Sequence, residues 1–145
     1  MSSPSAGASQ VQGGAAAHEV AGVVTKASPR PVPDTVNRLT EMVEGKGIKV
    51  FAVIDHSGEA EHVGLQLRDT KLVVFASPKA GTPVMVAAPL TAHDLPLKIL
   101  VWDDDGQTRV SYTAPETLAA RYDLSDELVA ALAVIGPLTD ALVRP

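Results

Sequence analysis

The sequence of 145 residues contains no cysteine. This absence excludes disulfide bonds, thiolate zinc sites, iron–sulfur clusters held by cysteine, and cysteine nucleophiles. Aromatic residues are also scarce, at 3% of the chain, so the core must consist mainly of aliphatic side chains. Any chemistry therefore falls mainly on the four histidines, the carboxylates and the lysines.

Positive charge is in deficit, because 12 Lys and Arg residues face 17 Asp and Glu residues, which gives a net charge of −5. Nucleic-acid phosphates and anionic lipids repel such a chain. No apolar run approaches the roughly 18 residues that span a bilayer. The basic start and continuous apolar stretch of a signal peptide are missing as well. We therefore expect a cytoplasmic protein that binds neither nucleic acid nor membrane.

The length and the hydrophobic content of 46% suit one domain with a substantial core. Residues 1–17 carry no charge, no aromatic residue and few large apolar residues. Such a segment buries too little surface to offset the entropy lost on ordering. We therefore predict a flexible tail over residues 1–17 and a single domain over residues 18–145.

Hydrophobic periodicity predicts an α+β domain, with a mixed sheet of about five strands, helices packed on it, a late hairpin and C-terminal helices. Residues 49–56 form a nearly continuous apolar run, which predicts a central strand buried on both faces. Asp104-Asp105-Gly106 is a hairpin turn signal. We expect strands over 18–27, 49–56, 71–75, 97–103 and 108–112, and helices over 33–44, 82–88, 115–122, 127–134 and 138–142.

The densest group of polar residues runs from Asp55 to His62, directly after the strand predicted at 49–56. His56 is our candidate catalytic residue, because an imidazole beside a carboxylate can act as a general acid or base near neutral pH. His56, His62 and a carboxylate could also bind a metal, but their spacing matches no tight metal motif. We predict no metal and no cofactor. Alternatively, His56 only forms a backbone hydrogen bond at the strand end.

A second candidate site lies where the strand at 71–75 gives way to a loop of small residues. Ser77 and Lys79 stand in this loop, just before the helix predicted at 82–88. Backbone N–H groups at such a helix start can hold an anion, which a lysine would assist. Alternatively, the segment is only a tight turn that needs Gly81 and two prolines.

The late hairpin carries two of the few aromatic residues, Trp102 and Tyr112. They could be cross-strand neighbours that either pack in the core or form the wall of a ligand pocket. Lys98 lies within an apolar strand of the same hairpin. Its side chain could extend from a half-buried face into solvent, or it could meet an acidic ligand.

An ordered set of residues over roughly 20–135 resembles the domain-of-unknown-function 302 family. The matching residues are Val50-Phe51-Ala52-Val53-Ile54-Asp55-His56, Ala60, Gly64-Leu65, Leu72-Val73-Val74-Phe75, Pro78-Lys79, Gly81-Thr82-Pro83, Met85, Leu95-Pro96-Leu97-Lys98, Val101-Trp102, Asp105-Gly106, Ser111-Tyr112, Pro115, Leu118-Ala119 and Arg121.

The resemblance implies a small α+β domain, often a homodimer, whose activity as a family is unassigned. It directs attention to five residues of this chain: His56, Lys79, Asp94, Lys98 and Tyr112. The chain departs from the family pattern at three places. It has Ala76-Ser77 where Gly-Asn is usual, Asp69 where Pro is frequent, and Tyr122 where His is common. A site that depends on Gly-Asn would be altered here, because alanine disfavours a positive φ.

Together these residues suggest a domain that binds a small anionic or carbonyl-containing molecule. The predicted pocket joins His56, Ser77, Lys79, Lys98, Trp102 and Tyr112. One alternative is a small enzyme that uses His56 as general acid or base. Another is a structural module whose apolar C-terminal helix forms a dimer interface.

Overall fold

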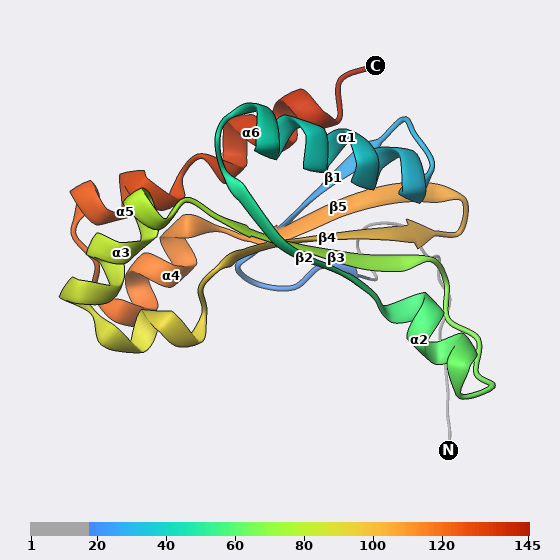
Figure 1. Cartoon of the computed structure of the whole chain (residues 1–145), viewed down its shortest axis with the longest axis horizontal. Helices are drawn as coiled ribbons and strands as arrows, with labels where there is room; N and C mark the ends of the chain where they lie inside the picture. The colour runs from blue at the N-terminus through green and yellow to red at the C-terminus, as the bar shows by residue number, and fades with distance from the viewer. Residues whose placement is uncertain (1–17) are drawn as a thin grey trace.

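The computed structural model describes residues 18–145 (Figure 1). The tail predicted over residues 1–17 lies outside the described residues. Within residues 18–145, no helix combines the length and the apolar character needed to cross a membrane.

The described chain forms one five-stranded sheet with helices, so the predicted α+β class is confirmed. The strand order is β1-β5-β4-β3-β2. All four pairings are antiparallel, which corrects the expectation of mixed strand directions. The strands are β1 (Val23–Ser28), β2 (Lys49–Asp55), β3 (Thr70–Ala76), β4 (Leu97–Asp104) and β5 (Gln107–Thr113).

The helices gather on one face and at both ends of the sheet (Figure 1). Two of them, α1 (Val32–Gly45) and α6 (Ile135–Leu142), lie over the same face. A short helix, α2 (His56–His62), lies at one end of the strands. The other end holds α3 (Pro78–Ala87), the 3-10 helix η3 (Pro89–His93), α4 (Pro115–Tyr122) and α5 (Asp126–Leu132).

The main core lies between the sheet and the pair α1 and α6. Proline in its first turn favours the start of α1, and Val36, Leu39 and Val43 give it one apolar stripe. This stripe packs on alternate residues of the central strands, among them Val73 and Phe75. As the composition predicts, the core is mostly aliphatic: of its thirteen buried members only Phe75 and Tyr112 are aromatic.

Strand β2 is at the edge of the sheet, so the prediction of a central strand buried on both faces is wrong. Phe51, Val53 and Ile54 are 47%, 44% and 38% exposed. The pairing of β2 with β3 is also irregular between Val50 and Ala52, where Phe51 forms a bulge. The continuous apolar run indicated strand correctly, but it could not show which neighbour is missing.

The hairpin of β4 and β5 turns where the sequence predicts, at Asp105 and Gly106. Both residues have positive φ angles, 50° and 95°, as a tight two-residue hairpin loop requires. The side chain of Asp103 accepts a hydrogen bond from the Gly106 N–H at 3.0 Å.

Candidate functional site

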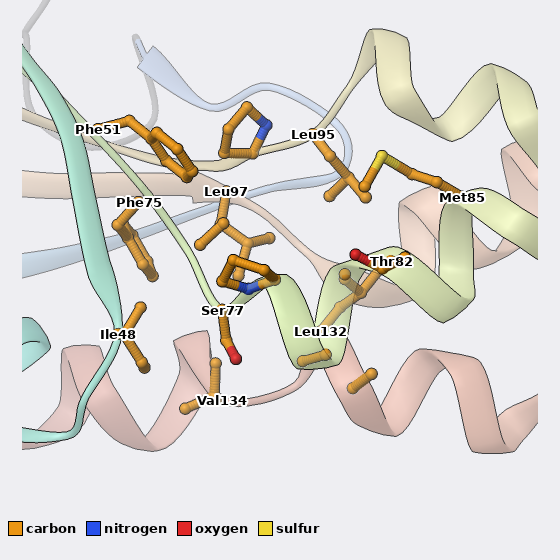
Figure 2. A pocket seen from close by; sticks show the side chains of 16 residues that line it. Ile48, Phe51, Phe75, Ser77, Thr82, Met85, Leu95, Leu97, Leu132 and Val134 are labelled. Carbon is orange, nitrogen blue, oxygen red and sulfur yellow. The ribbon is translucent and has the colours of Figure 1, made fainter.

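One cavity of about 190 Å³ lies where the sheet meets the helices α3 and α5. We call it the Ser77 pocket (Figure 2). Its walls come from the start of β2, the end of β3, the segment that leads into β4, and the two helices. They are formed by Ile48, Phe51, Phe75, Ala76, Ser77, Pro78, Ala80, Gly81, Thr82, Met85, Leu95, Pro96, Leu97, Ala131, Leu132 and Val134.

The lining is almost wholly apolar and includes no charged side chain. Ser77 and Thr82 are the two lining residues whose side chains carry a hydroxyl group, and both are labelled in Figure 2. The Ser77 hydroxyl makes no capping hydrogen bond to α3. A hydroxyl group can donate to a carbonyl oxygen and accept from a ligand O–H.

Local sequence explains why this space stays open. Ser77 and Pro78 end β3 and begin α3, and the Ser77 carbonyl accepts hydrogen bonds from the Ala80 and Gly81 N–H groups at 3.0 and 2.9 Å. A Cβ placed on Gly81 would have no heavy atom within 4 Å. Glycine and alanine on α3 therefore leave room that a larger side chain would fill.

The bulge in β2 contributes the outer wall. Residue Phe51 is the extra residue of the bulge and lines the pocket while remaining 47% exposed. Bulges redirect a side chain relative to the regular pleat and occur frequently beside binding sites. Figure 2 shows Phe51 on the same side of the pocket as Leu95, at the opposite end from Val134.

A polar cluster lies next to the Ser77 pocket. The Asp94 carboxylate accepts a short hydrogen bond from the Tyr122 hydroxyl and one from Arg121 Nη1 at 2.9 Å. The bond from Tyr122, and then that from Arg121, lowers the pKa of Asp94 below its ordinary value despite partial burial. Leu95 and Leu132 line both the Ser77 pocket and a narrow crevice that Asp94 and Tyr122 share.

This cluster holds the pocket wall in place. Asp94 immediately precedes Leu95 and Pro96, which line the pocket. Its bonds to α4 therefore tie the segment between η3 and β4 to that helix. Arg121 and Tyr122 position the wall and do not themselves line the cavity.

Of the six residues predicted to form a pocket, Ser77 alone lines this one. His56 begins α2, after the far end of β2. Asp55 pairs with Lys71 whereas Lys49 pairs with Ala76, so His56 and Ser77 lie at opposite ends of the strands. At about 3.4 Å per residue, roughly 20 Å separates them. The expectation that they share a pocket is therefore wrong.

The remaining lysines are also dispersed. Lys79 is exposed on α3 and does not line the cavity. Lys98 is next to Ile99, which faces the core, so its exposed side chain lies on the opposite face of the sheet. Its Nζ donates to the backbone carbonyl oxygens of Asp94 and Pro96 at 3.1 and 3.4 Å.

The two hairpin aromatics lie on opposite faces of the sheet. Tyr112 is buried in the main core, with Lys26 Nζ 5.2 Å from its ring centroid. Trp102 pairs with Arg109 across the hairpin, and its indole N–H donates to Ser111 Oγ at 3.0 Å. Tyr112 is three residues beyond Arg109, and an odd separation along a strand reverses the face, so the two aromatics are not cross-strand neighbours. A ligand contact at either residue remains a prediction.

Residues 18–145 contain no group of three or more histidine and carboxylate side chains arranged to hold a metal ion. His62 Nδ1 lies 3.9 Å from Glu59 Oε2, one turn away on α2, and both side chains are largely exposed. His56 has no such carboxylate contact among the ion pairs of the described residues.

The sequence analysis missed Phe51, Met85, Leu95 and Leu132 as pocket residues, and the bonding of Asp94 to Tyr122 beside them. The small residues over 76–82 were the available signal for the pocket. The contact between α3 and α5 joins residues some fifty positions apart, and no periodicity within either helix shows it.

Comparison with known proteins agrees with this fold. Residues 24–142 match the family described as "Domain of unknown function DUF302". A crystal structure of an uncharacterized conserved DUF302 protein from Bacillus stearothermophilus superimposes with a TM-score of 0.73 at 19% identity. The match covers 86% of this chain and 97% of that chain, and at this identity it shows the fold alone.

Curated relatives include proteins named fluoride-specific ion channel FluC 1 from Brucella suis and from Brucella abortus. Each is 34% identical over 104 residues, which is 71% of this chain. The chain spans only 41% and 38% of the length of these two relatives. The family match covers most of the sequence and nearly every element of the fold, and on this basis the chain belongs to the family of domains of unknown function DUF302.

Proposed function

We propose that the chain binds a small, uncharged and largely apolar molecule in the Ser77 pocket, with a carbonyl or hydroxyl group of the ligand directed at Ser77 or Thr82. The observation that carries this proposal is an apolar cavity with two hydroxyl-bearing residues and no charged lining side chain. Apolar pockets with few convergent polar groups are the usual form of small-molecule sites.

The lining selects between the two ligand classes expected from the sequence. An anionic group in this cavity would lose its hydration without meeting a cation, which is strongly unfavourable. A carbonyl group is uncharged, so it loses less hydration free energy on burial, and it can accept a hydrogen bond from a hydroxyl group. A carbonyl-containing ligand therefore fits the pocket, and an anionic one does not.

The volume limits the ligand to a single ring or a short acyl chain. Apolar cavities of about 150 Å³ accommodate benzene. At about 190 Å³, the Ser77 pocket has room for a ring with one small substituent.

Neither ion conduction nor catalysis by His56 is part of this proposal. The fluoride channels that the chain resembles are more than twice the length of the matched part, and an apolar lining offers no site for a fluoride ion. His56 stands at the opposite end of β2 from the pocket, so it cannot transfer a proton to a ligand bound there.

The test uses acetophenone as a probe, because it combines one ring with a carbonyl group. We expect acetophenone to raise the melting temperature of the wild-type protein in a concentration-dependent way. Gly81→Leu fills the cavity and should abolish the shift. Gly45→Leu is the matched control, since a Cβ on Gly45 in α1 would also meet no heavy atom within 4 Å. An equal shift in Gly81→Leu would overturn the proposal.

His56→Ala provides a second control in the same experiment. Because His56 lies at the far end of the strand, the acetophenone shift should be unchanged in this variant. A loss of the shift in His56→Ala would place the ligand near α2 instead of in the Ser77 pocket.

We also propose that the protein works as a homodimer. Large apolar side chains remain exposed on it, including Phe51, Val63 and Leu65 at 47%, 71% and 64%. Exposed large apolar side chains such as Val63 and Leu65, which are close in sequence just after α2, favour an interaction surface. Sedimentation equilibrium should therefore give twice the chain mass of 15.1 kDa.

A further inference from the structure

One face of the sheet has no helix across it among the described residues (Figure 1). It is the face away from α1 and α6, and we call it the open face. The alternation of side chains in β2, β3 and β4 places Ala52, Ile54, Leu72, Val74, Leu100 and Trp102 on it, together with polar residues that include Thr70, Lys98 and Asp104. The His18 ring packs edge-on against Trp102, with 5.1 Å between the ring centroids. Cross-strand pairing joins Ile54 to Leu72 and Leu72 to Leu100 in one apolar row.

The ends of the open face carry further exposed apolar residues. Figure 1 shows α2 at one end and η3 at the other, both on the side of the sheet away from α1 and α6. Val63 and Leu65, just after α2, are 71% and 64% exposed. Leu90 in η3 is 76% exposed. The open face therefore has an apolar row near its middle and exposed apolar residues near each end.

We propose that a second copy of this chain packs on the open face, about a two-fold axis that lies in the interface and runs across the strands. The proposal rests on the homodimer proposed above and names the surface that forms it. In this arrangement each strand lies over the same strand of the second copy, and the two ends of the open face exchange places.

The distribution of polarity selects this axis. Large apolar residues predominate in the half of the open face formed by β2, β3 and β4, although Thr70 and Lys98 also lie there. The half formed by β5 and β1 presents mainly polar residues, Thr25, Arg109 and Thr113, beside Val23. An axis across the strands places the apolar half on the apolar half of the second copy. An axis along the strands would place it on the polar half, which would bury polar groups against apolar side chains.

Charge complementarity selects the same axis. Glu59 and Glu61 lie on α2 at one end of the open face, and the Glu59 side chain is 75% exposed. Lys98 lies at the other end of the open face, and among the described residues its Nζ contacts only backbone oxygens. Exchanging the ends brings Lys98 of each copy toward Glu59 and Glu61 of the other, and such complementarity favours one orientation.

The sheet supplies most of the area that a stable pair needs, and the helices at its ends must supply the rest. Five strands of about seven residues cover roughly 24 Å by 24 Å, near 570 Å² of flat surface. A standard interface buries about 800 Å² on each partner. Pairing through the β2 edge is less suitable, because the bulge at Phe51 breaks the regular register that an added strand needs.

Two neighbouring residues provide a matched test. Ile54 and Val53 are both on β2 and are 38% and 44% exposed, but they lie on opposite faces of the sheet. Ile54→Lys places a charge on the open face and should convert the dimer to monomers in sedimentation equilibrium. Val53→Lys should leave the dimer intact. If Ile54→Lys also remains a dimer, the open face is not the interface, although the homodimer itself stands.

Cross-linking tests the direction of the axis, because the natural chain has no cysteine to interfere. Val63→Cys and Leu90→Cys occupy opposite ends of the open face. A short bismaleimide should join the two variants when they are mixed, after unfolding and refolding together. Each variant alone should stay uncrosslinked. Cross-links within Val63→Cys alone would indicate an axis along the strands and would overturn the arrangement. A monomeric mass for the wild-type protein would overturn both the homodimer and the interface.

Discussion

At the scale of single residues, Asp94 links separate parts of the fold. Its carboxylate accepts from Tyr122 and Arg121 on α4, while its backbone oxygen accepts from Lys98 on β4. One residue thus connects the segment before the pocket wall to a helix and a strand. Charge-assisted hydrogen bonds of this kind are stronger than neutral ones, and this side chain is only 25% exposed.

We expect Asp94→Asn to lower the free energy of unfolding by about 1 kcal/mol at pH 7, because the amide keeps the geometry but loses the charge. Urea denaturation measures this difference. Glu41→Gln, at an exposed position on α1, is the control and should change little. Equal stability of wild type and Asp94→Asn would show that the cluster does not stabilise the fold.

The same contacts predict that the stabilisation by Asp94 depends on pH. Hydrogen bonds from Tyr122 and then Arg121 lower the pKa of Asp94 in the folded protein below the value of 3.8. A carboxyl group whose pKa is lower in the folded than in the unfolded protein stabilises the folded state. This contribution is complete above the unfolded-state pKa and is lost as pH falls through the folded-state pKa. The stability difference between wild type and Asp94→Asn should therefore shrink as pH falls below about 4 and disappear once Asp94 is protonated in the folded protein. A difference that does not shrink as pH falls would exclude the charge as its source.

Residue types alone could locate part of the candidate site. The sequence predicts Ser77 at a strand end beside small residues, and it lines the pocket. It does not predict that Lys98 lies on the face away from α1 and α6, because that depends on which face of the sheet these helices cover. Asp94 and Tyr122 meet across 28 positions, and no local pattern encodes such a contact.

At the scale of elements, α2 is the least supported helix. It has seven residues, none of them buried. Asp55 caps it by accepting from the Gly58 N–H at 2.9 Å. A Cβ on Gly58 would approach Asp55 Oδ2 to 2.6 Å, so the capping carboxylate occupies the space that any larger residue would need. A helix this short depends on its cap, because few intrahelical bonds offset the cost of nucleation.

We expect Asp55→Ala to increase amide hydrogen exchange in α2 while exchange in β3 and β4 stays slow. Gly58→Ala should have a similar effect because its methyl group displaces the cap. In the double variant the second change should add little, since both remove the same interaction. Fully additive effects would mean that the two residues stabilise α2 separately.

Acid should loosen α2 in the wild-type protein as well. The hydrogen bond from Ser57, and next that from the Gly58 N–H, lower the pKa of Asp55 below 3.8. The cap is therefore intact above pH 3.8, and it is lost as pH falls through the lower pKa that Asp55 has in the folded protein. Amide chemical shifts of α2, followed by NMR as pH is lowered, should move toward unfolded values in this range. In Asp55→Ala the same amides should show no such step.

The type of most elements follows from sequence, but the neighbours of each strand do not. Alternation in β5 and the Asp105-Gly106 turn are local features, and both predict the hairpin. The run in β2 shows that its residues favour a strand with two apolar faces, yet this strand is at the sheet edge and most of its side chains are exposed. Burial of an edge strand depends on what packs against it, and the partner copy that we propose would cover Ala52 and Ile54.

At the scale of the whole molecule, association and stability should be coupled. If the native state is a dimer and the unfolded chain is a monomer, mass action makes the melting temperature depend on protein concentration. A tenfold dilution costs the dimer about 1.4 kcal/mol, which corresponds to a decrease of roughly 3 °C for an assembly of this size. Differential scanning calorimetry over a wide range of concentrations would resolve the trend.

The variants on β2 separate this coupling from a change in the fold of each chain. Val53→Lys should keep the concentration dependence of the wild-type protein, because its side chain is not on the open face. Ile54→Lys should lose the dependence and melt at one temperature throughout the range, close to the extrapolated value for the dilute wild-type protein. If wild type and Ile54→Lys both melt independently of concentration, folding does not require the second copy. The exposed apolar residues of β2 would then be tolerated by the monomer.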